Sequence, residues 1–360
     1  MRQVRWQADL DAAFAEALTQ KKLLFVLFRC QREKRDAAIL QPSDPKLIAL
    51  LTEHYIPVRL ISLKGVDLNR FRFDYDQQLM GLVLTPDGVT LARWGGDDVS
   101  LASLVAALER LKSVAWPKMG AVPAPQTLRQ KFPAFAQSKR AEEPCYHCHY
   151  AHDAEIEQQR KAGTFQKLSL FRYPPPSVLG LMLDDGNRIV SVRPGSVAAK
   201  VGLKVRERLT VLNDQSIYTA ADVAFALDAL PAKANRVVLN GKPAALPPGW
   251  RTYDISARPS QGAIPPIFGF WEEPVPGSKT LALKVNFVFP GEKWAPSLGG
   301  LKLGDVIVAV DGKTLPQMTP RQFHTWLRLN KDVGQKLKLT VMRDGKRLIL
   351  TLPCLDLRLD

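Results

Sequence analysis

The sequence predicts a multidomain protein in which an α/β domain is followed by two mainly β units. Helical and strand patterns alternate up to residue 116, prolines then gather in residues 117–176, and the rest repeats one order of strands, turns and helix. We therefore divide the chain into an α/β domain at 1–116, a Pro-rich connector at 117–176, and mainly β units at 177–270 and 271–360.

Composition indicates a globular chain with several cores. The 360 residues are 46% hydrophobic, and domains usually hold roughly 100–200 residues. The net charge of +15 comes from scattered Lys and Arg without a long basic block, which predicts a solvated surface and no nucleic-acid partner. No apolar run reaches the ~18 residues of a transmembrane segment. The start lacks a signal peptide, so we expect a cytoplasmic protein, or a periplasmic or exported one if its signal peptide has been removed.

The first domain is expected to contain a helix, a strand, a second helix, a second strand, a hairpin and a closing helix. Asp9 is a good N-cap for the first helix, and Asp44 is a candidate N-cap for the second. The predicted elements, in order, are the helix Leu10–Leu18, the strand Leu23–Phe28, the helix Pro45–His54, the strand Tyr55–Leu63, the strands Leu79–Thr85 and Val89–Trp94, and the helix Ser100–Ser113.

Two short segments of this domain carry a family resemblance. They run from Leu68 to Asp76 (LNRFRFDYD) and from Leu84 to Gly88 (LTPDG). They resemble the thioredoxin-like half of a bacterial family that joins a thioredoxin-like domain to PDZ domains and includes selenocysteine-containing members. The resemblance covers most of the chain and implies that residues 1–116 form a thioredoxin-like domain.

Cys30 follows the first predicted strand, where a thioredoxin active site begins. The cations around it, Arg29, Arg32, Lys34 and Arg35, favour a reactive thiolate. The family pattern has a second cysteine three residues later, but this chain has Glu33, and residues 77–82 lack the family's proline. A catalytic Cys30 therefore competes with the interpretation that it is a partly buried, unreactive cysteine.

The connector contains a compact Cys/His motif, Cys145-x-x-Cys148-His149. This spacing is typical of covalent haem c attachment, with both thiols bonded to the porphyrin and His149 as the iron ligand. Three alternatives remain open. The motif could bind zinc through Cys145, Cys148, His149 and His152, form a redox dithiol, or form an inert disulfide. Haem c is attached outside the bacterial cytoplasm, so haem binding at this motif would imply that the protein is periplasmic or exported.

The last unit carries a second resemblance, in Gly300–Ile307 followed by Asp311-Gly312. Glycine permits a tight turn, Asp305 can cap it, and the apolar residues after it enter a core. This pattern resembles a PDZ domain, so residues 271–360 are expected to form one. Residues 177–270 are expected to form another, with a Pro/Gly-rich extension. Val205-Arg206-Glu207 stands where the last unit has Leu303-Gly304-Asp305, which predicts a degenerate first copy.

The PDZ resemblance implies binding of extended peptides by strand addition, with the terminal carboxylate held by backbone N–H groups. We expect that loop at Leu179, Gly180 and Leu181 in the first unit, and at Gly277 and Ser278 in the second. The sequence contains no G-x-S-x-G elbow and no region that we can assign as a protease domain.

The sequence as a whole thus predicts a redox-associated docking protein, in which a thioredoxin-like domain and a haem-type centre are tethered to peptide-binding modules. The alternatives are a non-redox interaction scaffold with a structural metal or disulfide at the Cys/His motif, and a thiol–disulfide oxidoreductase. Enzymatic activity of its own is the less expected outcome.

Overall fold

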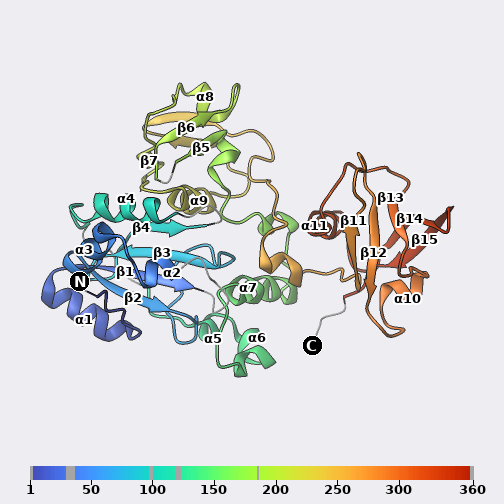
Figure 1. Ribbon diagram of the computed structural model, residues 1–360, viewed down its shortest axis with the longest axis horizontal. Helices are drawn as coiled ribbons and strands as arrows, with labels where there is room; N and C mark the ends of the chain where they lie inside the picture. Colours follow the sequence, from blue (N-terminus) through green and yellow to red (C-terminus); the bar gives the residue numbers. More distant parts are fainter. Residues whose placement is uncertain (1–2, 30–36, 97–99, 118–122, 185, 357–360) are drawn as a thin grey trace. The chain divides into compact units, whose positions relative to one another are not determined.

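The computed structural model describes residues 3–29, 37–96, 100–117, 123–184, 186–356, and they form two compact units, Met1–Tyr253 and Asp254–Asp360 (Figure 1). Each unit is described by itself. The first unit contains the expected α/β domain, the expected connector and most of the first expected mainly β unit. The boundary between the two units follows Tyr253, earlier than the expected boundary at residue 270. The division of the first unit into smaller domains stays a prediction.

The first unit begins with an α/β layer structure around a four-stranded sheet of order β2-β1-β3-β4. β1 and β2 are parallel, whereas β3 runs antiparallel to both β1 and β4. The predicted helices and strands are present in the expected order, and a short helix, α2, that was not predicted precedes α3. The elements are α1 (Leu10–Gln20), β1 (Leu23–Arg29), α2 (Ala37–Leu40), α3 (Pro45–Glu53), β2 (Tyr55–Leu60), β3 (Leu79–Leu84), β4 (Thr90–Gly95) and α4 (Leu101–Leu111).

Both faces of this sheet are buried, and β1 shows how. Leu24 and Val26 point into one core, while Phe25 and Leu27 point into the other, as expected for alternating side chains. Helices α3 and α4 cover the second core, and α1 covers part of the first. Asp9 and Asp44 cap α1 and α3 as predicted, each accepting two backbone N–H bonds.

The segment expected to be a connector is part of the first core. It folds into α5 (Leu128–Lys131), α6 (Pro133–Ala136), η1 (Lys139–Glu142), α7 (Tyr150–Lys161) and η2 (Lys167–Leu170). Apolar side chains of α5 to α7, among them Leu128 and Ala151, join α1 on the same face of the sheet. The second strand ends at Leu60 rather than Leu63, because the Leu63 N–H donates to the Tyr146 carbonyl at 2.9 Å.

The first unit ends with the first mainly β repeat. Its elements are η3 (Pro176–Leu179), β5 (Leu181–Leu183), β6 (Ile189–Val192), α8 (Val197–Lys200), β7 (Val211–Leu212), β8 (Gln215–Ser216), α9 (Ala220–Asp228), β9 (Arg236–Leu239) and β10 (Lys242–Ala245). The apolar residues that this repeat buries form a core of their own, and α9 also lies against β4 (Figure 1).

The second unit contains one five-stranded antiparallel sheet of order β11-β12-β13-β14-β15. Its elements are η4 (Pro259–Ala263), β11 (Phe270–Pro274), β12 (Leu283–Val288), α10 (Ala295–Gly299), β13 (Val306–Val310), α11 (Pro320–Asn330), β14 (Lys336–Arg343) and β15 (Lys346–Pro353). Strand side chains and Phe323 and Leu327 of α11 fill its core. The predicted closing hairpin, formed by β14 and β15, is confirmed.

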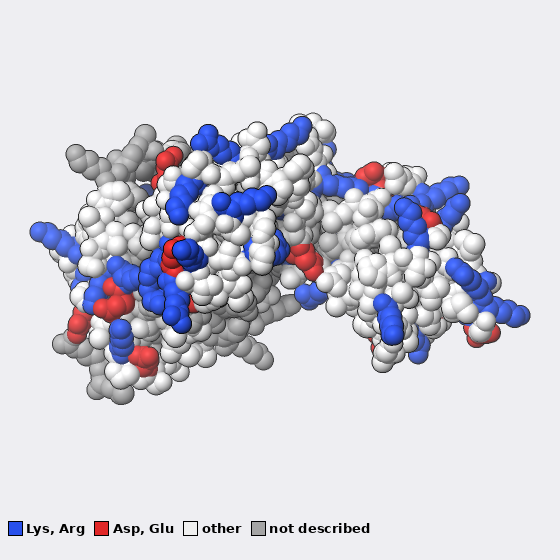
Figure 2. Space-filling view, turned by 90° about the horizontal axis from the view of Figure 1, so that it is seen from above, with Lys and Arg blue, Asp and Glu red and all other residues white. Residues whose placement is uncertain are grey.

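Two surface properties complete the fold. On the face drawn in Figure 2, Lys and Arg are spread out with Asp and Glu among them, as the sequence pattern indicates. Among the described residues, no helix combines the length and the apolar character needed to cross a membrane.

Candidate functional site

The second unit presents a strand edge next to a helix. β11 lies at the edge of the sheet and pairs with β12 on one side, and α11 packs against it. An edge strand exposes a row of backbone N–H and C=O groups to which another strand can be added. The arrangement is therefore suited to receiving an extended peptide.

A tight glycine turn leads into this strand. Gly269 has a φ of 72°, in the left-handed region, and a Cβ built on it would lie 2.6 Å from the Trp294 ring. Gly180 precedes β5 in the same way, with a φ of 81° and a Cβ position 2.2 Å from the Ser196 Cβ. Ser196 and Trp294 are the N-cap residues of α8 and α10. The two turns are thus equivalent parts of an internal repeat.

This equivalence shows a turn that the sequence interpretation missed. The predicted residues Leu179, Gly180 and Leu181 lie at the turn into β5, whereas Gly277 and Ser278 lie in the connection from β11 to β12. The partner of Gly180 in the repeat is Gly269. The same sequence pattern occurs at both turns: two apolar residues, a glycine and another apolar residue, as VLGL at 178–181 and IFGF at 267–270. This pattern was the signal from which the Gly269 turn could have been predicted.

Polar side chains with unused bonding capacity lie where α11 meets β11. The His324 Nε2 lies 3.0 Å from the Glu272 carboxylate, and Arg328 donates to Gln261 at 3.1 Å. Burial lowers the pKa of Arg328 to about 10, and Glu272 opposes that shift. The buried atoms without a hydrogen-bond partner among the described residues include Glu272 Oε1, His324 Nδ1 and Arg328 Nε. Buried polar groups normally find partners, so the interface between α11 and β11 retains unused hydrogen-bonding capacity.

The corresponding helix of the first repeat, α9, is held at both ends by the rest of its unit. At its start, Asp222 accepts backbone N–H bonds from Arg93 at 2.8 Å and Tyr218 at 3.0 Å. The Arg93 guanidinium lies 3.3 Å from the centre of the Phe225 ring. This helix is therefore tied to β4 of the α/β layer.

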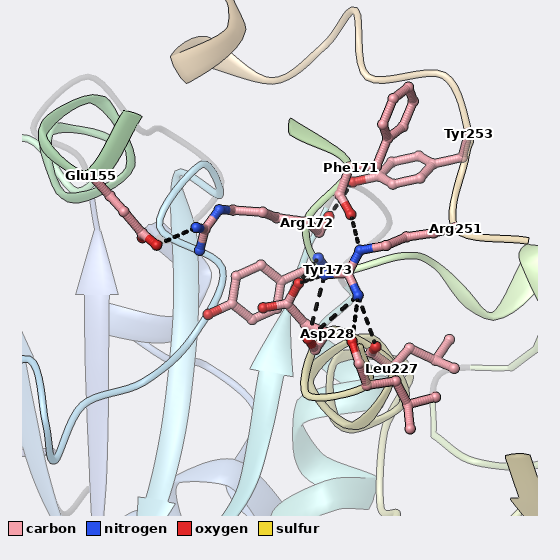
Figure 3. A network of polar contacts seen from close by, with 9 residues as sticks. Glu155, Phe171, Arg172, Tyr173, Leu227, Asp228, Arg251 and Tyr253 are labelled. Atoms are coloured by element: carbon pink, nitrogen blue, oxygen red, sulfur yellow. Dashed lines mark hydrogen bonds and ion pairs between the residues drawn. The ribbon is translucent and has the colours of Figure 1, made fainter. Parts of the chain in front are cut away.

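Arg251 holds the other end of α9 (Figure 3). Its guanidinium pairs with Asp228 and donates to the Leu230 carbonyl at 2.9 Å and the Phe171 carbonyl at 2.8 Å. The bond to Leu230 satisfies a carbonyl just beyond the C-terminus of α9, where a helix leaves its carbonyls unpaired, and the bond to Phe171 joins this end to another segment of the unit. In the same view, Arg172 pairs with Glu155 of α7.

The Cys/His motif lies immediately before α7. The Cys145 thiol donates to the Ile61 carbonyl at 3.3 Å, and Cys148 packs against the first core. The His149 ring contacts the rings of His147 and Tyr150, and burial lowers the pKa of His149 to about 4. Cys145 and Cys148 are not joined to each other by a disulfide in the structure.

The four residues predicted as zinc ligands do not gather around one point. In the part of the chain that the structure describes, one group of three or more metal-ligand side chains has its ligand atoms within 4.8 Å of one another, and it contains His152 with Asp74 and Asp76 but neither cysteine. Cys30 lies outside the described residues. Binding of haem c or zinc at Cys145, Cys148 and His149 stays a prediction.

Comparisons with known proteins identify the repeated units. Residues 188–240 and 294–353 each match a family model described as a PDZ domain. The chain therefore has two PDZ domains within a mixed α/β structure. PDZ domains as a class bind extended peptides. The comparison with curated proteins found no match.

Solved structures of HtrA-type proteases show local similarity. The protease AlgW with a decapeptide is 17% identical, with a TM-score of 0.25 over 47% of this chain and 55% of that chain. The same protease with a tripeptide is 16% identical, with a TM-score of 0.26 over 47% and 58% of the two chains. This chain thus spans less than two thirds of the length of these structures.

The comparisons correct the expected function. We predicted a redox-associated docking protein whose function involves haem and redox chemistry. That prediction was wrong: the matches are to PDZ domains and to HtrA-type proteases with peptides. The structure also gives a physical reason why the Cys145-x-x-Cys148-His149 motif was a weak basis for predicting redox function. Its five-residue spacing fixes neither the direction nor the surroundings of the side chains, and Cys148 and His149 pack against neighbouring residues of the first unit.

Proposed function

We propose that the protein is a peptide-binding protein, and that its second PDZ domain receives a peptide as an added strand along β11. The observation that carries the proposal is the free edge of β11, which follows the Gly269 turn and lies against α11. A turn of this kind presents backbone N–H groups that can hold a terminal carboxylate. The ligand is therefore an extended peptide with a free C-terminus.

Two contrasts favour the second domain over the first. Strand β5 has three residues, Leu181–Leu183, whereas β11 has five, Phe270–Pro274, so β11 offers a longer ladder of backbone groups. Helix α9 is fixed at both ends to other parts of its unit. By contrast, the interface of α11 with β11 retains unpaired buried atoms of Glu272, His324 and Arg328.

We also infer a thioredoxin-like fold for the α/β layer at residues 3–116. The support is its strand order, β2-β1-β3-β4, with a parallel first pair and an antiparallel last pair. The inference concerns architecture and carries no chemical activity.

Peptide binding can be tested with a library of fluorescent ten-residue peptides that have randomised C-terminal residues. We expect selected peptides to bind the full chain with micromolar affinity, and their amidated forms to bind at least about tenfold more weakly, a loss of about 1.4 kcal/mol. The substitution His324→Phe should weaken binding similarly, because it removes the ring nitrogen Nε2 that lies beside Glu272. His54→Phe, at the end of α3, is the matched control.

Hydrogen exchange then locates the bound peptide. A saturating peptide should slow amide exchange in β11 and leave β15, the opposite edge of the same sheet, unchanged. Protection of β5 without β11 would assign the activity to the first domain and contradict the proposal. Equal affinity for free and amidated peptides would contradict the role of the carboxylate.

A further inference from the structure

Three buried side chains of the kinds that bind metals lie close together in the first unit. In the sequence they are far from the β11 edge described above. Asp74 and Asp76 come from the segment between β2 and β3, and His152 comes from the first turn of α7. Their ligand atoms all lie within 4.8 Å of one another, and the His152 Nδ1 lies 3.3 Å from the Asp76 carboxylate. We propose that these three residues bind a divalent transition-metal ion.

The state of His152 is the independent observation that points to a ligand. The residue is 1% exposed, and neither ring nitrogen has a hydrogen-bond partner among the described residues. Its ring is held between Tyr75, with centroids 5.3 Å apart, and Tyr173, at 5.9 Å. A buried imidazole whose ring nitrogens make no hydrogen bond costs free energy, and a metal ion bonded to one nitrogen lowers that cost.

The charge and burial of the two aspartates fit the same ligand. Asp74 and Asp76 are 8% and 6% exposed. Asp74 is oriented from within the segment, because one of its oxygens accepts the Asp76 backbone N–H at 3.2 Å. Two neighbouring carboxylates are costly to bury when ionised, and a divalent cation between them compensates that charge.

A cavity borders the His152 side of this group. It has a volume of about 390 Å³, and its wall includes His152, Tyr75, Tyr173, Arg72 and Lys131, whereas neither Asp74 nor Asp76 lines it. An ion held by three protein ligands can therefore keep a further coordination position for water or a small anion on the cavity side. Three protein ligands with an open position distinguish exchangeable or catalytic sites from closed structural ones.

The donor set selects the class of ion. One imidazole nitrogen and two carboxylates suit zinc, manganese and related divalent ions, whereas calcium and magnesium favour ligand sets composed of oxygen. Within the transition series, zinc binds a given set more tightly than manganese. We therefore expect zinc to bind more tightly than manganese, and both to bind more tightly than magnesium.

The test is a titration of the chelator-treated full chain with ZnCl₂, MnCl₂ and MgCl₂ by calorimetry. We expect one zinc site that depends on Asp76 and His152, with affinity lowered at least about 100-fold in Asp76→Asn and His152→Gln. The double variant Cys145→Ser/Cys148→Ser should retain the site. Zinc binding that survives both ligand substitutions and disappears in the cysteine variant would overturn the proposal.

A spectroscopic measurement on the unmodified chain covers the case in which a variant does not fold. Cobalt should occupy the site and give the visible absorption of an ion bound by nitrogen and oxygen, without a thiolate charge-transfer band. A strong thiolate band would move the metal to Cys145 and Cys148 and overturn the assignment. Failure of zinc, manganese and cobalt to bind would also overturn it.

Discussion

Arg206 occupies in the first PDZ domain the position that Gly304 occupies in the second. Their φ angles are 74° and 88°. Arg206 donates its backbone N–H to the Ile189 carbonyl at 2.8 Å, and Gly304 donates its own to the Val285 carbonyl at 2.8 Å. The first copy therefore keeps the geometry of the turn without the glycine that favours it.

The first prediction concerns this pair. A left-handed backbone costs a non-glycine residue roughly 1–2 kcal/mol, partly offset by the entropy that glycine loses on folding. We expect Arg206→Gly to raise the free energy of unfolding by about 0.5–1 kcal/mol and Gly304→Arg to lower it by about 1 kcal/mol. Urea unfolding of the full chain measures both. A loss of stability in Arg206→Gly would contradict the assigned strain.

The second prediction concerns the turn into β11. Gly269→Ala should lower the unfolding free energy by about 2–3 kcal/mol, since it combines a left-handed backbone with overpacking against buried Trp294. Peptide affinity should fall with it. Gly262→Ala is the matched control, because a Cβ there has no neighbouring atom within 4 Å, and it should change stability by less than about 0.5 kcal/mol. Equal effects of the two substitutions would rule out the crowding argument.

The third prediction concerns Arg251. Arg251→Ala leaves the Asp228 carboxylate and the carbonyls of Phe171 and Leu230 without this donor. We expect a loss of about 3 kcal/mol in the unfolding free energy, as for other partly buried pairs broken on one side. Arg251→Lys should recover only part of it, because an ammonium cannot reproduce the planar set of donors. Exposed Arg236→Ala serves as the control, and a similar loss there would contradict the prediction.

The fourth prediction is a pH dependence. Burial raises the pKa of Asp222 from its ordinary 3.8 to about 6. The folded state thus binds this proton more tightly, so the stabilisation is fully present below pH 3.8 and is lost as the pH rises through about 6. The unfolding free energy of the wild type minus that of Asp222→Asn should fall by on the order of 2–3 kcal/mol across this window. A constant difference between the two proteins would contradict it.

Local signals predicted much of the fold. Hydrophobic patterns and the caps Asp9 and Asp44 placed the helices and strands of the α/β layer within a few residues. The PDZ pattern around Gly304 and Asp305 predicted the second domain, where Asp305 caps its turn by accepting the Lys302 N–H at 2.9 Å. Such features depend on neighbours in the sequence, so they can be inferred from the sequence alone.

Features that depend on distant residues were not predicted. Phe132 and Tyr146 belong to the first core, but they stand in a Pro-rich segment without a helical or strand period. The sequence analysis grouped His152 with the neighbouring cysteines, whereas folding places it beside Asp76, which precedes β3. Proximity in the chain was a poor guide to proximity in the site.

The contact of Arg93 with Asp222 has a consequence for how the sequence can change during evolution. One is on β4 and the other on α9, and the Asp222 carboxylate accepts the Arg93 backbone N–H while lying 4.0 Å from its guanidinium. The ion pair depends on both side chains, so we expect that in homologues a change at one position accompanies a change at the other. The first PDZ domain and the α/β layer should consequently have been passed on together, and recombination between them should be rare among descendants.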